Sequence, residues 1–314
     1  MKIVKEKVNI MSEAQLQKLV FSLQQGGVIA FPTETVYALA GDARNVSAVK
    51  RIFRLKARPL TQPLSVLLPQ NYDLAEWAND VSPLAQRLAD CFWPGPLTLI
   101  FNKKASVLSE LTGGGSKIGL RVPDHPIAQA ILQAFAGGLA APSANRSTHL
   151  SPTQPLHVRQ AFADGLDAIV DGGACSIGIE STIVDVSSGI PRLLRLGAIP
   201  QEAIQRVIDS ELMVDSSVFG RIRFPLRQIE REELENTVHH YLNQGTSITV
   251  LARQPARINH ANLIWITMPE EASDYGRVLY QHLHEVERNS TSQILIESLP
   301  MNETWAGIRA LLQS

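Results

Sequence analysis

The sequence predicts an α/β protein with a large domain around one mixed sheet and a small second α/β domain. Segments with helical spacing of apolar residues alternate with short apolar runs of strand length along most of the chain. At 314 residues, the chain is also longer than one compact domain usually is. Apolar residues make up 45% of it and charged residues 19%, which indicates a folded protein with ample core material.

The first helix is predicted from its boundaries as well as from its apolar spacing. Ser12 stands directly before the apolar rhythm of residues 16–23, as a helix N-cap does, and Gly26 and Gly27 follow it. Further helices are predicted over residues 48–55, 84–92, 127–135 and 200–208. Short buried strands are predicted over residues 28–31, 64–68, 97–101, 118–122, 139–141, 168–171, 181–186 and 193–196.

Residues 209–227 lose this periodicity and mix Ser, Gly, Pro and Arg, which is typical of a linker. After them the alternation resumes, with strands predicted over residues 247–251, 263–267 and 293–297 and helices over residues 272–288 and 304–312. We therefore expect a first domain over residues 1–208, a linker over residues 209–230 and a second domain over residues 231–314.

Charge and cysteine content argue against several classes of protein. Lys and Arg total 29 against 30 Asp and Glu, so the whole chain has no net field that would attract nucleic acid, although a local basic patch stays open. Cys91 and Cys175 are too few for a disulfide framework, which favours a reducing compartment. The N-terminal residues lack a secretory signal, and no apolar run approaches the ~20 residues of a membrane span. We expect a cytoplasmic protein with no membrane partner.

Two segments near the first strands could carry chemistry. The segment Phe31-Pro-Thr-Glu-Thr-Val-Tyr37 places two hydroxyls and a carboxylate at a strand end, where α/β proteins often build sites, or else it forms a threonine-rich turn. The segment Lys56-Ala-Arg-Pro-Leu-Thr-Gln-Pro63 holds a lysine and an arginine on a proline-stiffened loop or helix end. These two cations could bind one polyphosphate, or they could form a solvated helix end.

Later segments repeat this pattern of hydroxyls, amides and cations at predicted strand ends. Gly138-Leu-Ala-Ala-Pro-Ser-Ala-Asn145, followed by Ser151-Pro-Thr153, could hold phosphate oxygens or a magnesium ion, or could form a structural turn. Gly178-Ile-Glu-Ser-Thr182 and Leu193-Leu-Arg-Leu-Gly197 add two hydroxyls and a cation. Arg121 ends another strand, where a surface ion pair is the alternative role. The recurrence predicts that these groups converge on one cleft.

Several familiar motifs are absent from the sequence. There is neither a Gly-x-x-x-x-Gly-Lys-Ser/Thr phosphate loop nor a Gly-x-Gly-x-x-Gly dinucleotide fingerprint. Gly113-Gly-Gly115 precedes a strand, which favours a loop role. The histidines show no metal-ligand spacing, so we predict no metal-binding side chains.

Seven ordered blocks of the sequence resemble the Sua5/YrdC/YciO family of threonylcarbamoyl-AMP synthases. The match runs from Gly26 to about Pro200. The blocks are Phe31-Pro-Thr-Glu-Thr-Val-Tyr37, Lys56-Ala-Arg-Pro59, Trp93-Pro-Gly-Pro-Leu-Thr98, Leu120-Arg-Val-Pro-Asp-His-Pro126, Ala141-Pro-Ser-Ala-Asn145, Ser151-Pro-Thr153 and Gly178-Ile-Glu-Ser-Thr182. The extension after the linker resembles the two-domain Sua5 form of the family, and the single-domain YrdC form lacks it.

The resemblance implies an open, twisted mixed sheet of the YrdC-like type with a deep positive cleft, followed by a small Rossmann-like C-terminal α/β domain. It implies a nucleotidyltransferase that makes threonylcarbamoyl-AMP and pyrophosphate from L-threonine, bicarbonate or CO2, and ATP. ATP would be a substrate, with Mg2+ carried by the nucleotide. The product would pass to a tRNA threonylcarbamoyl transferase, which forms N6-threonylcarbamoyladenosine at position 37 of tRNA.

The resemblance also implies a set of site residues. The family's Lys-x-Arg and Ser-x-Asn signatures around the triphosphate correspond to Lys56, Arg58, Ser143 and Asn145, which we expect to be catalytic. Further ATP contacts are expected from Gln62, Ser151, Arg195 and the backbone near Lys117. The L-threonine pocket is expected to comprise Thr35, Arg121, Ser181 and the backbone at Ala141. In that pocket, Arg121 would pair with the substrate carboxylate, which a bidentate guanidinium suits.

The sequence departs from the family pattern at several places. Ala38 follows Tyr37 where glycine is usual, and Leu67 stands where many Sua5 proteins have a histidine near the threonine. The linker lacks the usual Pro-Gly-Met and His-Tyr segments. Candidate substitutes for these segments are Phe219, Arg221, Arg223 and Phe224.

Two alternatives to a threonylcarbamoyl-AMP synthase stay open. A YrdC-like concave surface could bind RNA, weakly or as its main role, although the net charge and the lack of an aromatic and basic stripe speak against a main role. The enzyme could also adenylate a different carbamate, as the YrdC-like domains of larger carbamoyltransferases do. No attached transferase domain is recognised in this sequence, which speaks against that second alternative.

Overall fold

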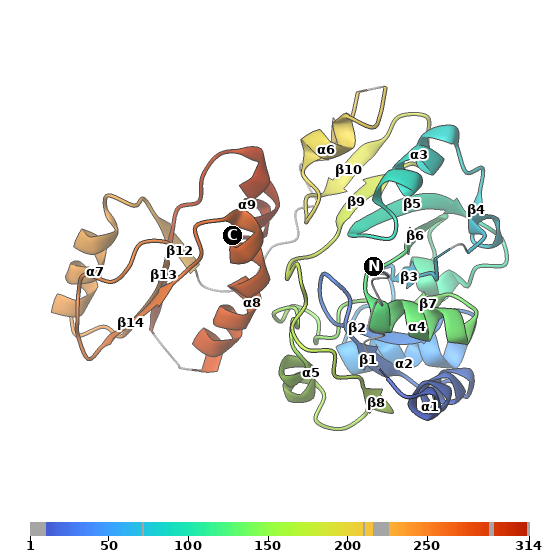
Figure 1. Cartoon of the computed structure of the whole chain (residues 1–314), viewed down its shortest axis with the longest axis horizontal. Helices are drawn as coiled ribbons and strands as arrows, with labels where there is room; N and C mark the ends of the chain where they lie inside the picture. The colour runs from blue at the N-terminus through green and yellow to red at the C-terminus, as the bar shows by residue number, and fades with distance from the viewer. Residues whose placement is uncertain (1–10, 71, 210, 216–225, 289–291, 313–314) are drawn as a thin grey trace, which may run out of the picture.

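The computed structural model describes residues 11–70, 72–209, 211–215, 226–288 and 292–312. These residues form two parts, each with its own sheet (Figure 1). The α/β class that the sequence predicts is therefore confirmed. Among the described residues, no helix is long and apolar enough to cross a membrane.

The large part is built on a mixed sheet. Its strands follow the order β11 (Met213–Val214), β10 (Arg192–Arg195), β9 (Thr182–Asp185), β5 (Leu97–Lys103), β6 (Lys117–Arg121), β3 (Ser65–Leu67), β7 (Leu139–Ala140), β2 (Ala38–Asp42), β1 (Ile29–Phe31) and β8 (Ala168–Ile169), and β4 (Ala78–Asn79) pairs with β5 off this path. Strand β5 is parallel to β9 and antiparallel to β6, and β6 is parallel to β3. Because β6 and β3 run side by side in register, Leu67 faces Arg121 across the pair.

Helices cover both faces of the large sheet. Helices α1 (Glu13–Gln24) and α4 (Pro126–Phe135) pack on one face, and α2 (Val46–Lys56) and α3 (Pro83–Phe92) pack on the other. In β1, alternate residues point to opposite faces, so Ala30 joins one apolar core while Ile29 and Phe31 join the other. The predicted N-cap of α1 is confirmed, because Ser12 and Gln15 form a reciprocal capping box.

The small part has a parallel sheet with helices on both faces. Its strands follow the order β12 (Leu226–Ile229), β15 (Gln293–Glu297), β13 (Ile248–Ala252) and β14 (Leu263–Thr267). Helix α7 (Leu234–Asn243) packs on the outer face, whereas α8 (Ala272–Arg288) and α9 (Ala306–Leu312) lie on the face toward the large part (Figure 1).

Some elements lie where the sequence patterns did not indicate them. The strand β2 consists mostly of small residues, Ala38-Leu-Ala-Gly-Asp42, which have weak strand preference, and it forms through antiparallel pairing with β1. The stretch 209–230, assigned above to a linker, contains β11 of the large sheet and β12 of the small sheet. The remaining short elements are α5 (Pro155–Ala161), α6 (Gln201–Gln205), η1 (Leu74–Glu76), η2 (Ser109–Thr112) and η3 (Glu303–Trp305). The candidate linker substitutes Phe219, Arg221, Arg223 and Phe224 lie outside the described residues.

The two parts share an apolar contact. Leu150 and Ile179 of the large part are buried in the same core cluster as Leu279 and Leu283 of α8. Backbones also approach closely there, because a Cβ added to Gly307 of α9 would lie only 2.1 Å from a backbone oxygen of the large part. The small part therefore packs directly against loops of the large part.

Candidate active site

A cleft of about 420 Å3 opens in the large part of the molecule. Its walls come from five of the motif segments found in the sequence and from strands β3, β5 and β6. Several predicted site residues line it, namely Thr35, Arg58, Arg121, Ala141, Ser143, Ser181 and Arg195. The predicted convergence of strand ends on one cleft is therefore confirmed for these residues, while Lys56, Gln62, Lys117, Asn145 and Ser151 lie outside its lining.

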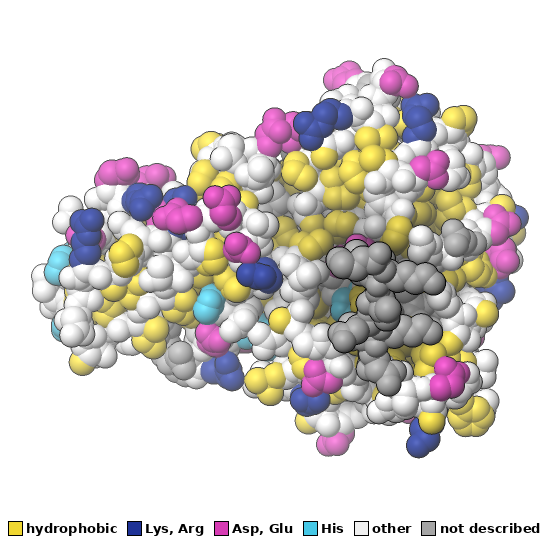
Figure 2. All heavy atoms as spheres, viewed as in Figure 1, with side chains coloured by type: hydrophobic (Ala, Val, Ile, Leu, Met, Phe, Trp, Pro, Cys, Tyr) yellow, Lys and Arg dark blue, Asp and Glu magenta, His cyan; other side chains and the backbone are white. Residues whose placement is uncertain are grey.

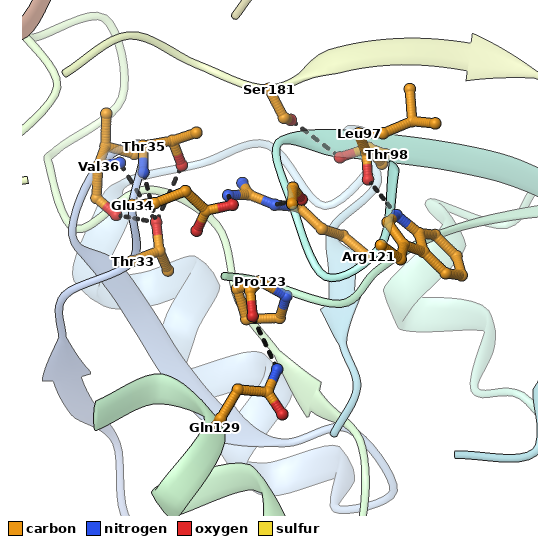
Figure 3. A network of polar contacts seen from close by, with 12 residues as sticks. Thr33, Glu34, Thr35, Val36, Leu97, Thr98, Arg121, Pro123, Gln129 and Ser181 are labelled. Atoms are coloured by element: carbon orange, nitrogen blue, oxygen red, sulfur yellow. Dashed lines mark hydrogen bonds and ion pairs between the residues drawn. The ribbon is translucent and has the colours of Figure 1, made fainter. Parts of the chain in front are cut away.

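Arg121 is fixed in the cleft by a buried ion pair (Figure 3). Its Nη2 atom lies 2.7 Å from Glu34 Oε1, and its Nε donates to the Gly95 carbonyl at 3.2 Å. The side chains of Arg121 and Glu34 are only 8% and 3% exposed, so the surface ion pair considered for Arg121 is wrong. Glu34 comes from the turn after β1 and is the carboxylate of the segment Phe31–Tyr37, to which no individual role was assigned above. Glu34 belongs to the site because it pairs with Arg121, which is distant from it in the sequence.

The turn that contains Glu34 is held by threonine hydroxyls. Thr33 Oγ1 donates to the Val36 carbonyl at 2.6 Å and lies 2.9 Å from Thr35 Oγ1 (Figure 3). The threonine-rich turn and the site segment are therefore the same structure, because the turn presents Thr35 to the cleft. Ser181 lies on the opposite wall, where its hydroxyl is 2.9 Å from that of Thr98.

Backbone contacts join the motif after β7 to this turn. Ala38 and Ser143 form an isolated bridge, and Ala144 N donates to the Tyr37 carbonyl at 2.7 Å. The Ala141 N–H already donates to the Ser65 carbonyl at 2.8 Å. The carbonyl oxygen of Ala141 is therefore the backbone group that a ligand in the cleft could meet.

Arg58 also lines the cleft and lies just beyond helix α2. Ala57 adopts the left-handed conformation with φ 50°, which ends the helix after Lys56, as the prolines predicted. The half-buried Arg58 guanidinium donates to the Pro63 carbonyl at 2.9 Å and to the Gln62 carbonyl at 3.4 Å. Gln62 is exposed, and it accepts the hydrogen bond from Arg58 through its backbone carbonyl.

Lys56 lies beneath the cleft wall and is 2% exposed, so the solvated helix end considered above is wrong for it. Its Nζ donates to the carbonyls of Ser143 at 2.5 Å and Asn145 at 2.6 Å, and to Asn145 Oδ1 at 3.2 Å. Burial, together with the neighbouring Arg58, lowers the pKa of Lys56 to about 7. Three oxygen acceptors match the three protons of an ammonium, whereas a neutral amine would leave one acceptor unpaired, so these contacts favour the charged form.

The Ser143 and Asn145 side chains continue this network. Ser143 Oγ donates to Asn145 Oδ1 at 2.6 Å, and Asn145 Nδ2 donates to the His149 carbonyl at 2.6 Å. Ser143 lines the cleft, whereas Asn145 is buried behind it. Lys56 and Asn145 therefore hold the loop that presents Ser143.

Arg195 and Glu180 form the wall nearest to the small part. The Arg195 Nε and Nη2 atoms donate to the Ser181 carbonyl at 3.0 and 2.8 Å, and burial lowers the pKa of Arg195 while Glu180 opposes that shift. Ser151 lies behind this wall and donates from Oγ to Glu180 Oε1 at 2.6 Å. Glu180 lines the cleft, although the sequence analysis gave it no role.

Lys117 is exposed on β6, and its side chain pairs with Asp185 at 2.7 Å. The resemblance assigned a role only to the backbone near this residue. Glu180 is thus a cleft carboxylate to which sequence reasoning assigned no role, and Glu34 supports the cleft residue Arg121 from outside the lining. Both glutamates lie inside motif segments named above, and each stands next to a residue with an assigned role, Thr35 or Ser181. That position was the sequence signal for them.

Known proteins match both parts of the chain. The sequence model of the Sua5/YciO/YrdC family, described as "Telomere recombination", matches residues 22–197, and that of the "Threonylcarbamoyl-AMP synthase, C-terminal domain" matches residues 221–313. A threonylcarbamoyl-AMP synthase of Bacillus subtilis is 32% identical over 309 residues, which cover 92% of this chain and 89% of that protein. One from Pyrococcus abyssi is 41% identical over 199 residues, which cover 63% of this chain and 58% of that protein.

Solved structures give the same result. The Pyrococcus abyssi Sua5 protein in complex with L-threonine superposes with a TM-score of 0.88 at 29% identity, over 96% of this chain and 93% of that one. The Escherichia coli YciO structure matches with a TM-score of 0.55 at 26% identity and covers 59% of this chain and 90% of that one. The chain therefore belongs to the Sua5/YciO/YrdC family, in its two-domain Sua5 form, the threonylcarbamoyl-AMP synthases.

Proposed function

We propose that this chain makes threonylcarbamoyl-AMP, the product in its relatives' name, together with pyrophosphate from L-threonine, bicarbonate or CO2, and ATP. The convergence of Arg58, Arg121 and Arg195 on one cleft is the observation that carries the proposal. L-threonine carries a carboxylate and ATP a triphosphate, and guanidinium groups bind carboxylates and phosphates with fixed geometry. Hydroxyls of Thr35, Ser143 and Ser181 surround these cations, so the cleft can bind polar ligands without adding negative charge there.

The proposed sites divide the cleft into two halves. Arg121, Thr35, Ser181 and the Ala141 backbone would bind L-threonine, with Arg121 on its carboxylate. ATP would contact Arg58, Gln62, Ser143, Ser151, Arg195 and the backbone near Lys117. Because Lys56 and Asn145 hold the Ser143 loop, their proposed catalytic role is to keep positive charge and a hydroxyl in place near the triphosphate.

The chemistry requires positioning more than a protein nucleophile. The threonine amine adds to CO2 and releases a proton, which gives a carbamate. A carbamate oxygen then attacks the α-phosphorus of ATP, the bond to the bridging oxygen breaks, and pyrophosphate leaves. Fixed cations that face the phosphates would stabilise the charge that develops on them.

The proposal also covers the metal ion, the downstream partner and the cellular compartment. We propose that Mg2+ arrives with ATP, since hard cations of this kind are commonly bound with substrate phosphates. The product would pass to a tRNA threonylcarbamoyl transferase that modifies position 37 of tRNA. Cytoplasmic action is proposed because both cysteines, Cys91 and Cys175, are free thiols.

Pyrophosphate release from ATP tests this function directly. We expect release that requires both L-threonine and bicarbonate, with each omitted in turn as a control. Release that requires carbamoyl phosphate instead would favour adenylation of a different carbamate. Tight, salt-sensitive RNA binding without ATP turnover would favour an RNA-binding protein. The face shown in Figure 2 speaks against this alternative, because acidic and basic side chains are interspersed over it.

A further inference from the structure

A carboxylate in the cleft is held by the small part of the molecule. Glu180 lines the cleft, and its Oε1 accepts hydrogen bonds from Ser151 Oγ at 2.6 Å and from the Tyr280 hydroxyl at 2.8 Å. Tyr280 lies on α8, so it reaches this cleft residue from the C-terminal part of the chain. Burial and the adjacent Glu180 carboxylate raise the pKa of Tyr280, so its hydroxyl stays protonated and can donate.

Close packing holds α8 against this point. Leu150 and Ile179, which directly precede Ser151 and Glu180 in the chain, are buried in the core of the small part. Backbone touches backbone beside them, because a Cβ on Gly178 would come within 2.5 Å of the Gly276 carbonyl oxygen. Dense packing of this kind leaves little freedom, so the position of the Tyr280 hydroxyl is set by the domain contact.

A second α8 contact reaches the same loop. His284, one helical turn after Tyr280, places its Nε2 atom 3.1 Å from the Ser151 carbonyl oxygen. Gln281 lies between them and accepts a hydrogen bond from Gln154 at 2.9 Å. The loop that carries Ser151 is therefore held along its length by one face of α8.

These contacts fall on one half of the cleft. Ser151 and Arg195 are proposed ATP contacts, and Arg195 lies close enough to Glu180 to interact with its charge. The contacts that fix Arg121, in the proposed threonine half, come from Glu34 and Gly95 of the large part. Tyr280 and His284 of the small part therefore contact the nucleotide half through Glu180 and Ser151.

We propose that Tyr280 is a positioning residue for ATP, which holds the Glu180 carboxylate, and through it Ser151 and Arg195, where the nucleotide meets them. This proposal rests on the proposed function, which assigns ATP to that half of the cleft. Glu180 Oε2 is buried and has no hydrogen-bond partner within the described part of the chain. A buried carboxylate oxygen without a partner is costly, so Glu180 depends on the two donors to its Oε1, Ser151 and Tyr280, to stay in this position.

The test compares Tyr280→Phe with Tyr275→Phe in steady-state pyrophosphate release by the full chain. Both variants lose one hydroxyl from α8, but the buried Tyr275 hydroxyl has no hydrogen-bond partner among the described residues, and the Tyr275 ring packs edge-on against Trp305 of the small part. We expect Tyr280→Phe to raise KM for ATP about tenfold, the scale for a hydrogen bond to a charged group, and KM for threonine less than about twofold. Tyr275→Phe leaves both constants unchanged.

A second variant shows whether Tyr280 acts through Glu180. Glu180→Ala raises KM for ATP as well, and adding Tyr280→Phe to it produces no further change, because the partner is already gone. Equal KM values for ATP in Tyr280→Phe and wild type would overturn the proposal, as would an equal rise for both substrates. If Tyr280→Phe does not fold, Glu180→Ala is measured alone. A rise in KM for ATP without a comparable rise in KM for threonine then supports the proposal, and an equal rise for both substrates overturns it. Failure of the proposed function is distinct, because wild type would then release no threonine-dependent pyrophosphate.

Discussion

The two halves of the cleft hold their cations in different ways. Arg121 is buried, paired with Glu34 and bound to the Gly95 carbonyl, all within the large part. Arg58 is half-buried and is held by two backbone carbonyls of its own loop. A single small carboxylate needs a guanidinium that is already fixed, since there are few other contacts to orient it. A triphosphate makes many contacts, so no single cation has to orient it alone.

The largest effect is expected from removing Arg121, the fixed cation of the proposed threonine half. We predict that Arg121→Ala lowers kcat/KM for threonine by about 10³-fold and the free energy of unfolding by about 3–5 kcal/mol, because the buried Glu34 charge loses its partner. Kinetics and urea unfolding measure the two effects. Adding Glu34→Ala should restore much of the stability but none of the turnover. An Arg121→Ala variant with wild-type stability and wild-type kcat/KM for threonine would refute the proposed role of Arg121.

The next comparison concerns Lys56 and Arg58, which lie two residues apart. We predict that Lys56→Ala and Arg58→Ala each lower turnover by ~10²-fold or more, the scale for losing one preorganised contact. Lys56→Ala should also lower the free energy of unfolding by about 2 kcal/mol or more, because its three oxygen acceptors lose their donor. Arg58→Ala should leave unfolding within about 1 kcal/mol of wild type. Near-normal turnover in both purified variants would contradict the placement.

A smaller effect is expected from a change of pH at His157, which stacks on His284 of α8. Burial, with His284 stacked at 3.8 Å between ring centroids, lowers the pKa of His157 to about 3. Between about pH 3 and 6.5 the unfolded chain binds this proton and the folded chain does not, so stability is full above pH 6.5 and falls as pH decreases, by up to about 1.4 kcal/mol per unit. Unfolding measured at neutral and mildly acidic pH checks this slope.

The matched variant for this prediction is His157→Asn. Asparagine can still accept the hydrogen bond that the Thr153 N–H donates to His157 Nδ1 at 3.2 Å, but it does not titrate. We expect the variant to lose less stability than wild type on acidification. Identical pH slopes for the two proteins would show that His157 does not contribute.

The smallest expected effect is at Lys117. Its side chain is about half exposed and pairs with Asp185, away from the residues that line the cleft. We predict that Lys117→Ala changes turnover by less than about twofold and stability by no more than about 1 kcal/mol, as for other surface ion pairs. A large loss of ATP affinity would show that the side chain, and not only the nearby backbone, contacts the nucleotide.

Local patterns predicted much of the fold. Strands β13, β14 and β15 of the small part and helix α8 lie close to their predicted ranges, because their apolar periodicity is strong, whereas β12 was assigned to the linker. Strand β2 was missed because its small side chains carry no such signal, and pairing with β1 creates it. The predicted strand ends placed Arg121, Ser143 and Arg195 in one cleft before any coordinates were known.

The sequence by itself determined the class of fold, the segments that carry hydroxyls and cations, and the family resemblance. These follow from local chemistry, since apolar spacing and motif order can be read along the chain. Only the tertiary structure decided that Glu34 fixes Arg121, that Lys56 lies beneath the cleft, and that Tyr280 reaches Glu180 across 100 positions of sequence. The physical reason is that burial and partner choice depend on residues brought together by packing, and no local pattern specifies which distant group will lie there.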